Sequence, residues 1–251
     1  MSRVEDAGLN ASAPPQQRWL DGWLVRTLPG KARRARCINA LAPGRLPLAQ
    51  KLALAADVYR AAGLPMILRL HRFTQPPTLD AELERLGWPV VDHTTVMIRA
   101  ELGGLSPRAL PAGIELAPLD GADFARAVGS LRGSPPEHIE AHTLRLQHSP
   151  VPYRGHVLRR RTDGWVLACG QTAREGPMVG LYDVFTHPEA RNQGLAALLC
   201  ERLLALSTAE GAGTGYLQVD AANAPAIAVY RRLGFQPAYG YHYRDAPGAA
   251  G

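Results

Sequence analysis

The sequence predicts an α/β protein made of two consecutive halves, and three observations support this prediction. Segments with strand-like and helix-like hydrophobic spacing alternate along most of the chain. A stretch rich in glycine and proline, 103–113, interrupts every periodic pattern near the middle. Segments 79–89 and 226–237 each show a short helical pattern ended by Leu-Gly-aromatic, then a proline and a strand pattern. We therefore expect two copies of one strand–helix unit.

The first half is expected to form a domain over 18–105, preceded by a flexible tail. Residues 1–17 show no periodicity and contain Ala13-Pro14-Pro15, which favours a loose segment. The helix pattern that begins at Leu48 stops at Gly63, as helices commonly do. The expected strands are 19–27, 36–41, 66–70 and 90–98, and the expected helices are 48–62 and 79–86.

The second half, 112–251, is expected to form the domain that carries the chemistry. Its longest helix pattern, 194–209, places Leu195, Leu199 and Leu206 on one face. The expected strands are 114–116, 155–161, 165–172, 178–185, 216–219 and 239–244, and the expected helices are 120–132, 136–147, 194–209 and 224–233.

Composition excludes several classes of protein. A chain of 251 residues with 46% apolar and 20% charged residues is neither a disordered tail nor a fibrous repeat. No apolar run approaches the roughly 18–20 residues that span a bilayer. The first ten residues are polar and acidic, unlike a secretory signal. We expect a soluble, cytoplasmic protein with no membrane partner.

Cysteine and histidine spacing gives no sign of a metal site. Cys37, Cys169 and Cys200 are odd in number and lie in apolar stretches, so we expect buried, reduced thiols. His138 and His142 are four residues apart, a spacing that can bind metal, but no third ligand is in phase. We therefore expect these histidines to face solvent or substrate, and we expect no metal.

The net charge of +6 raises the question of nucleic-acid binding. The basic runs at 33–36 and 159–161 lack interleaved aromatic residues and any known nucleic-acid motif. We therefore expect both runs to lie on solvated surface or to help bind an acidic phosphate group, with no nucleic-acid partner. A nucleic-acid-binding protein would instead show steeply salt-dependent binding to DNA or RNA.

The segment 184–199 predicts an anion-binding turn. A strand pattern ends at Pro188, and the chain enters a helix at Gly194. Up to four amide groups at a helix start have no partner within the helix, and the helix dipole adds partial positive charge. Gly194 and Ala196 are small enough for close approach of an anion, and Arg191 supplies a full charge. The turn lacks the Walker and dinucleotide-binding patterns, but it suits a pyrophosphate.

Two motifs in this region resemble the GCN5-related N-acetyltransferase (GNAT) superfamily. Arg191-x-x-Gly194-x-Ala196 follows a hydrophobic strand and His187-Pro188-Glu189, and it is similar to the Gln/Arg-x-x-Gly-x-Gly/Ala acetyl-CoA loop of that family. Asn223-x-x-Ala226-x-x-x-Tyr230-x-x-x-Gly234-Phe235 is similar to its second signature. The resemblance covers about 112–245.

The resemblance implies the GNAT fold, an α/β (α+β) architecture with a mixed central sheet and helices on both faces. Combined with the similarity between segments 79–89 and 226–237, it implies two tandem GNAT-like domains. In the first half, Pro43-Gly44-Arg45-Leu46-Pro47 stands where the phosphate loop would be. This segment lacks the family pattern, so the N-terminal domain is expected to be degenerate and not to bind the cofactor.

The resemblance further implies an acetyl-CoA-dependent N-acetyltransferase that needs no metal. The acceptor would be a primary amine of an amino acid, small amine or peptide that attacks the thioester directly, and the protein would be a monomer or homodimer. The expected cofactor-binding residues are Val184, Phe185 and Thr186 for the pantetheine arm, Arg191, Asn192, Gln193, Gly194, Leu195 and Ala196 for the pyrophosphate, and Asn223 for the pantetheine arm from the next helix.

The catalytic assignments keep alternatives. Tyr230 stands where the family often has a general acid, and a phenol with a reference pKa near ~10 can protonate the departing thiolate; it could also simply pack. Asp183 is the expected general base, with Asp220 or an ordered water chain as competitors. A non-catalytic acyl-CoA sensor with the same fold is the alternative function.

The acceptor itself is weakly indicated by the start of the chain. Trp19, Trp23, Arg26 and Arg33-Arg34-Ala35 are loosely similar to tandem acetyltransferases that resemble the actinobacterial type of N-acetylglutamate synthase. Glutamate is therefore one expected acceptor beside other amino acids, small amines and peptide N-termini.

Overall fold

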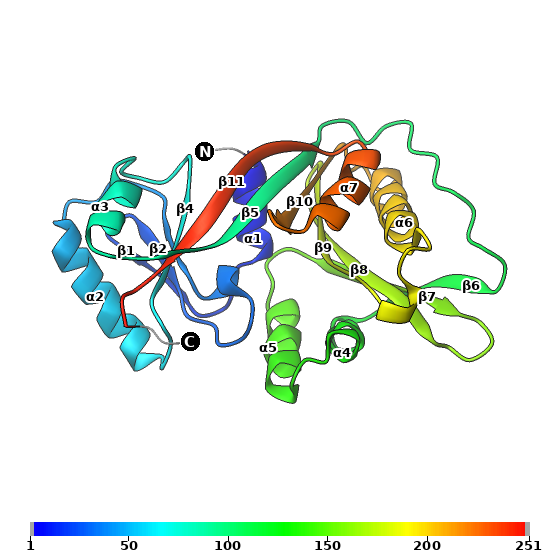
Figure 1. Cartoon of the computed structure of the whole chain (residues 1–251), viewed down its shortest axis with the longest axis horizontal. Helices are drawn as coiled ribbons and strands as arrows, with labels where there is room; N and C mark the ends of the chain where they lie inside the picture. Colours follow the sequence, from blue (N-terminus) through cyan, green and yellow to red (C-terminus); the bar gives the residue numbers. More distant parts are fainter. Residues whose placement is uncertain (1–2, 249–251) are drawn as a thin grey trace.

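A computed structural model describes residues 3–248 and contains one sheet of eleven strands (Figure 1). The strands are β1 (Gln17–Leu20), β2 (Trp23–Arg26), β3 (Ile38–Ala40), β4 (Ile67–His71), β5 (Val90–Arg99), β6 (Ile114–Leu119), β7 (Tyr153–Arg160), β8 (Val166–Glu175), β9 (Met178–Thr186), β10 (Thr214–Asp220) and β11 (Gln236–Asp245). The helices are α1 (Arg3–Ala11), α2 (Leu48–Ala61), α3 (Leu79–Arg85), α4 (Gly121–Arg132), α5 (Pro136–Gln147), α6 (Leu195–Ala209) and α7 (Ala224–Arg232), with short 3-10 turns η1 (Arg33–Ala35) and η2 (Pro188–Ala190).

The last strand of each half of the chain pairs with the other half. The strand order is β1-β2-β3-β4-β11-β5-β10-β9-β8-β7-β6. Strand β11 pairs antiparallel with β4, and β5 pairs antiparallel with β10, while β5 and β11 also pair with each other. Figure 1 shows these two long strands side by side across the middle of the molecule. The two halves therefore share one continuous sheet.

Helices cover both faces of the sheet in the second half. Leu199 and Leu203 of α6 pack with Leu158 and neighbouring sheet residues on one face. Phe124 of α4 packs with Val157 on the other face. Val157 and Leu158 are consecutive, and consecutive side chains of a strand point to opposite faces. The predicted fold class, a mixed sheet with helices on both faces, is confirmed.

The first half has a core of its own under α2 and α3. Tyr59 of α2 and Leu83 of α3 are buried with Ile38 and Leu68 of the sheet. The Tyr59 hydroxyl donates a hydrogen bond to the Arg26 carbonyl oxygen at 2.9 Å, which satisfies its polar atom inside the core.

The prediction of a flexible tail over 1–17 is wrong for the residues that the structure describes; residues 1 and 2 lie outside them. Helix α1 packs on the middle of the sheet, with Val4, Ala7 and Ala11 buried. Glu5 is 1% exposed, pairs with Arg69 of β4 and accepts a hydrogen bond from the Tyr239 hydroxyl at 2.6 Å. A nine-residue helix holds no repeating apolar pattern long enough to be recognised, so tertiary contacts decide its structure.

The single strand expected at 19–27 is a hairpin instead. Strands β1 and β2 pair through a turn at Asp21 and Gly22, whose φ angles are 42° and 84°. The left-handed backbone of this two-residue turn is typical of tight hairpins. The three cysteines are free and buried, as expected, and burial raises the pKa of the Cys169 and Cys200 thiols to about 12.

Candidate active site

Strands β9 and β10 open away from each other at the centre of the sheet. They pair in parallel from Met178 opposite Thr214 to Leu181 opposite Leu217, and the pairing ends there although both strands continue. Beyond this point β9 still pairs with β8, through Phe185 opposite Cys169 and Thr186 opposite Ala168. The edge of Val184, Phe185 and Thr186 that faces β10 is therefore unpaired. The sequence prediction placed the pantetheine arm against these three residues.

A bulge marks the point of divergence. Between the Gln171–Tyr182 and Cys169–Phe185 pairs, β9 contains one more residue than β8. Asp183 lies in this bulge with a φ of 50°, a left-handed conformation that Asp tolerates better than most residues. The bulge turns the end of β9 and aims the Asp183 side chain.

The loop after β9 presents backbone amides to solvent. Asn192 and Gly194 both have positive φ, 62° and 73°, and α6 begins at the next residue, Leu195. Asn192, Gln193 and Gly194 are exposed, Leu195 is buried and Ala196 is half-buried. Within 3–248, the amides of residues 192–196 donate to no protein acceptor. Such a turn at a helix start forms a concave group of N–H donors suited to an anion.

Two arginines lie beside this loop. The Arg191 guanidinium folds back over the Phe185 ring, 5.6 Å from its centroid, and its Nε is 3.5 Å from the Thr186 carbonyl oxygen. Arg108, from the segment between the halves, also lies near the loop: its Nη1 is 3.8 Å from the place of a Cβ on Gly194. Its Nε pairs with Glu201 of α6 at 2.9 Å. The sequence does not single out Arg108 as a site residue, because segment 103–113 contains no motif and no helix or strand pattern.

The second predicted motif forms helix α7. Asn223 is its N-cap, with Oδ1 accepting a hydrogen bond from the Ala226 amide at 3.1 Å. Tyr230 packs against the α6 side of the sheet, edge-on to Phe235 with centroids 6.2 Å apart. Burial, with a smaller contribution from Cys200, raises the pKa of Tyr230 above its ordinary value. The phenol therefore keeps its proton well above neutral pH.

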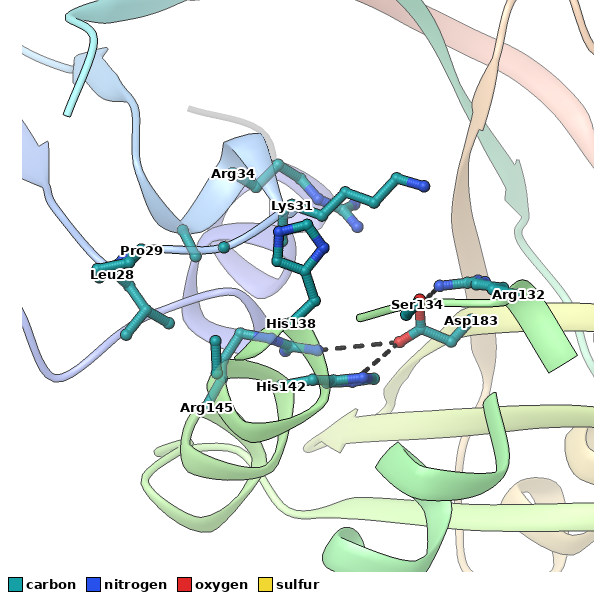
Figure 2. A pocket seen from close by; sticks show the side chains of 14 residues that line it. Leu28, Pro29, Lys31, Arg34, Arg132, Ser134, His138, His142, Arg145 and Asp183 are labelled. Atoms are coloured by element: carbon teal, nitrogen blue, oxygen red, sulfur yellow. Dashed lines mark hydrogen bonds and ion pairs between the residues drawn. The ribbon is translucent and has the colours of Figure 1, made fainter. Parts of the chain in front are cut away.

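Asp183 projects from the opposite face, among cations from α4 and α5 (Figure 2). Its Oδ1 accepts a hydrogen bond from Arg132 Nη1 at 3.0 Å, and its Oδ2 accepts one from Gln171 Nε2 at 2.7 Å. His142 Nε2 and Arg145 Nη2 lie 3.4 Å and 3.8 Å from Oδ2. Burial alone would raise the pKa of this carboxyl, but His142, Arg132 and Arg145 outweigh it and hold the pKa well below its usual range. A carboxylate in this environment is a weak base.

A pocket of about 250 Å³ lies between the two halves and is lined by Asp183, Arg132, His142 and Arg145, among others (Figure 2). One wall is the loop 28–35 of the first half, which includes Lys31 and Arg34. The other wall consists of Arg132, Ser134, residues of α5 and Asp183. Both His138 and His142 line the pocket.

The remaining predicted residues have other surroundings. Asp220, the competing base, accepts a hydrogen bond from the Ala222 amide at 2.8 Å in the turn before α7. The expectation that residues 33–36 form a solvated run is wrong: Arg33 pairs with Asp92 and Asp245, and Arg34 donates a hydrogen bond to Gln218. Residues 3–248 include no cluster of three or more histidine, cysteine or acidic side chains arranged for a metal ion, and no helix long and apolar enough to cross a membrane.

Comparison with known proteins agrees with this geometry. Residues 126–235 match the sequence model of the Acetyltransferase (GNAT) family. A search of curated proteins by sequence gives no significant match. Among solved structures, a GCN5-related N-acetyltransferase from Kribbella flavida is 20% identical, with a TM-score of 0.68, covering 98% of this chain and 95% of that one.

Two further structures show the same fold. A tandem GNAT protein from the clavulanic acid biosynthesis pathway is 18% identical, with a TM-score of 0.65, covering 81% of this chain and 71% of that one. A GCN5-related N-acetyltransferase from Sphaerobacter thermophilus is 18% identical, with a TM-score of 0.61, covering 79% and 67%. Members of this family transfer an acetyl group from acetyl-CoA to an acceptor amine. Residues 126–235 thus match the sequence model of the Acetyltransferase (GNAT) family, and the chain as a whole has the fold seen in GNAT proteins, including a tandem one.

Proposed function

We propose that this protein is an N-acetyltransferase that moves the acetyl group of acetyl-CoA to a primary amine by direct attack. The observation that carries the proposal is the opening between β9 and β10, which lies next to a helix start with free amides. An open backbone edge suits the amide-bearing pantetheine arm, because each peptide-like group on the arm can pair with a free N–H or C=O. The amides at the helix start suit the pyrophosphate that follows it.

In this proposal, each predicted cofactor residue has a distinct part. The backbone of Val184, Phe185 and Thr186 pairs with the pantetheine arm, as a missing strand would. The amides of Asn192 to Ala196 bind the pyrophosphate, with positive charge supplied by Arg191 and Arg108. Asn223 reaches the arm with its side-chain nitrogen, since its oxygen is already occupied as the cap of α7.

The proton donor and the proton acceptor of the proposed reaction lie on opposite faces of the sheet. The amine nitrogen forms a bond to the thioester carbon, and the carbon–sulfur bond breaks. Tyr230, kept protonated by burial, gives its proton to the departing sulfur.

The amine must lose a proton, and Asp183 alone is poorly suited to take it because its ion pairs stabilise the charged form. We assign this step to the pair of His142 and Asp183, with the imidazole as base and the carboxylate orienting it across 3.4 Å. Histidine is the side chain that exchanges protons most readily near neutral pH.

Release of free thiol from acetyl-CoA, measured across a panel of primary amines, tests the proposal. We expect saturable release that depends on both acetyl-CoA and one class of amine. Saturable CoA binding in calorimetry without turnover on any amine would instead favour a non-catalytic acyl-CoA sensor. Absence of CoA binding by folded protein would contradict both functions.

A further inference from the structure

The pocket beside Asp183 lies at the mouth of the opening between β9 and β10. Asp183 and Gln218 follow closely after Leu181 and Leu217, the last residues that pair across the two strands. Arg132 binds the Asp183 carboxylate, and Arg34 donates a hydrogen bond to the Gln218 side-chain oxygen. Cations from both halves of the chain thus flank the point where the proposed thioester would lie. They lie on the face opposite α6 and Tyr230, so the pocket is distinct from the proposed CoA site.

The lining of this pocket has a large excess of positive charge. Lys31, Arg34, Arg132 and Arg145 line it, and Asp183 is its one carboxylate. Leaving His138 and His142 out of the count, the four cations and one carboxylate give the lining a net charge of +3. Of these four cations, Arg132 lies nearest to the Asp183 carboxylate, at 3.0 Å, and Arg145 lies 3.8 Å from it.

Two of these arginines lack a full counter-charge. Arg145 is only 8% exposed, yet its nearest carboxylate oxygen, Asp183 Oδ2, is 3.8 Å away, and its Nη1 bonds the neutral Tyr153 hydroxyl at 3.3 Å. Within the described chain Arg34 pairs with no carboxylate; its guanidinium lies 5.5 Å from the centre of the Tyr182 ring. Arg145 is buried and Arg34 is half-buried. Because burying charge without a full partner is unfavourable, an anion bound beside these two arginines would be stabilised.

We propose that this pocket binds the acceptor, and that the acceptor is a small primary amine bearing a carboxylate, such as an amino acid. That the acceptor carries an amine rests on the proposed function, and that it carries a carboxylate rests on the lining of the pocket. Guanidinium groups bind carboxylates through paired hydrogen bonds, which also fix the orientation of the ligand. A volume of about 250 Å³ lies below the ~300–1,000 Å³ of pockets for larger ligands, which favours an acceptor of amino-acid size.

The first half of the chain is then part of the acceptor site. Lys31 and Arg34 come from the loop 28–35, which packs closely on α5: a Cβ on Gly30 would lie 3.2 Å from the Ala141 Cβ. The predicted degenerate domain thus contributes specificity although it lacks a phosphate loop of its own.

Acceptor kinetics test the inference, with L-glutamate, L-glutamine, glutamic acid α-amide and putrescine as probes. At least one probe with a carboxylate should exceed putrescine in kcat/KM by tenfold or more. Arg34→Gln and Arg145→Gln each remove a charged hydrogen bond to the acceptor carboxylate. Each should raise the KM for the best carboxylate-bearing probe by roughly tenfold or more, with the KM for acetyl-CoA unchanged. Lys31→Glu reverses an exposed charge and should raise the acceptor KM without risk to folding. Arg126→Gln, on α4 outside the pocket, is the matched control and should change nothing.

Binding of the acetylated product gives a readout that does not depend on turnover. Calorimetry with N-acetyl-L-glutamate and N-acetylputrescine, in the presence of CoA, should show preference for the carboxylate-bearing product, lost in Lys31→Glu. Equal binding of both products, or equal use of putrescine and the amino acids, would overturn the inference while leaving an acetyltransferase intact. Failure of CoA itself to bind would instead count against the proposed function.

Discussion

Arg132 of α4 donates a hydrogen bond from Nη1 to Oδ1 of Asp183 in the β9 bulge, and His142 Nε2 lies 3.4 Å from the other oxygen of the same carboxylate. The Asp183 side chain thus links α4 and α5, on one face of the sheet, to strand β9. The low pKa of Asp183 follows from this arrangement and suits the carboxylate to the orienting role proposed for it.

If His142 and Asp183 act as one unit, their variants should be non-additive. His142→Gln and Asp183→Asn should each lower kcat by about 10²–10⁴-fold, the usual contribution of a general base. The double variant should be no worse than either single one. Asn is a suitable replacement at position 183 because it also tolerates the positive φ found there. Steady-state thiol release measures kcat for the two single variants and the double variant. If the fold-losses in kcat of the single variants multiplied in the double variant, the paired role would be contradicted.

Gly194 tests the anion-binding loop. Its φ of 73° disfavours any side chain, and a Cβ there would point toward Arg108 beside the free amides. Gly194→Val should weaken CoA binding by roughly tenfold or more, because even one or two lost charge-assisted hydrogen bonds are worth about 1.5–3 kcal/mol each. Calorimetric titration with CoA is the measurement.

Gly164→Val is the matched control for this experiment. Gly164 has a similar φ of 72° in the turn after β7, with nothing within 4 Å of a Cβ. It shares the conformational cost of the substitution but lies away from the loop, so its CoA affinity should stay at the wild-type value. Equal losses in both variants would show that general destabilisation, not the loop, explains the effect.

Among the residues of α1, Glu5 should make the largest contribution to the free energy of unfolding. Glu5→Gln leaves Arg69, 3% exposed, without its counter-charge, and removing one partner of such a pair costs about 3–5 kcal/mol. Urea unfolding measures the change. Asp57→Asn breaks an exposed pair with Arg60 and should cost less than about 1 kcal/mol. Similar losses in the two variants would contradict the buried role of Glu5.

The same pair predicts a pH dependence of stability. Burial by itself would raise the pKa of Glu5, but Arg69 and His71 outweigh it and hold the pKa far below its ordinary value. The unfolded state therefore takes up a proton at this residue while the folded state does not, so the free energy of unfolding falls as pH drops below about 5. In Glu5→Gln this fall should be shallower, and an unchanged slope would argue against the assignment.

Local pattern was sufficient for most elements of this fold. The helix beginning at Leu48 and the strand ending near Thr186 were predicted because each carries its own periodicity and a clear stop. Helix α1 was not, because its structure depends on Glu5 meeting Arg69, 64 residues away. The pairing of β5 and β11 with strands of the opposite half could not be predicted for the same reason: the whole sheet determines which strands pair, and the local sequence does not encode it.

In the candidate site too, features formed by consecutive residues could be predicted and features formed by distant residues could not. The loop at Gly194 could be predicted because its amides belong to consecutive residues. The pocket beside Asp183 could not, since Arg34 and Arg145 come from opposite halves and line the same pocket only in the folded protein. Asp183 was singled out for its place beside the strand end, but its role as a base depended on neighbours that the sequence does not reveal.

Turnover by Tyr230→Phe tests the central claim most directly, because the substitution removes one hydroxyl from a ring that otherwise keeps its packing against Phe235. With acetyl-CoA and the best amine of the panel, the variant should lose kcat by about 10²-fold or more while CoA affinity stays at the wild-type value. Full thiol release by folded Tyr230→Phe would contradict the account of how this opening in the sheet performs acetyl transfer.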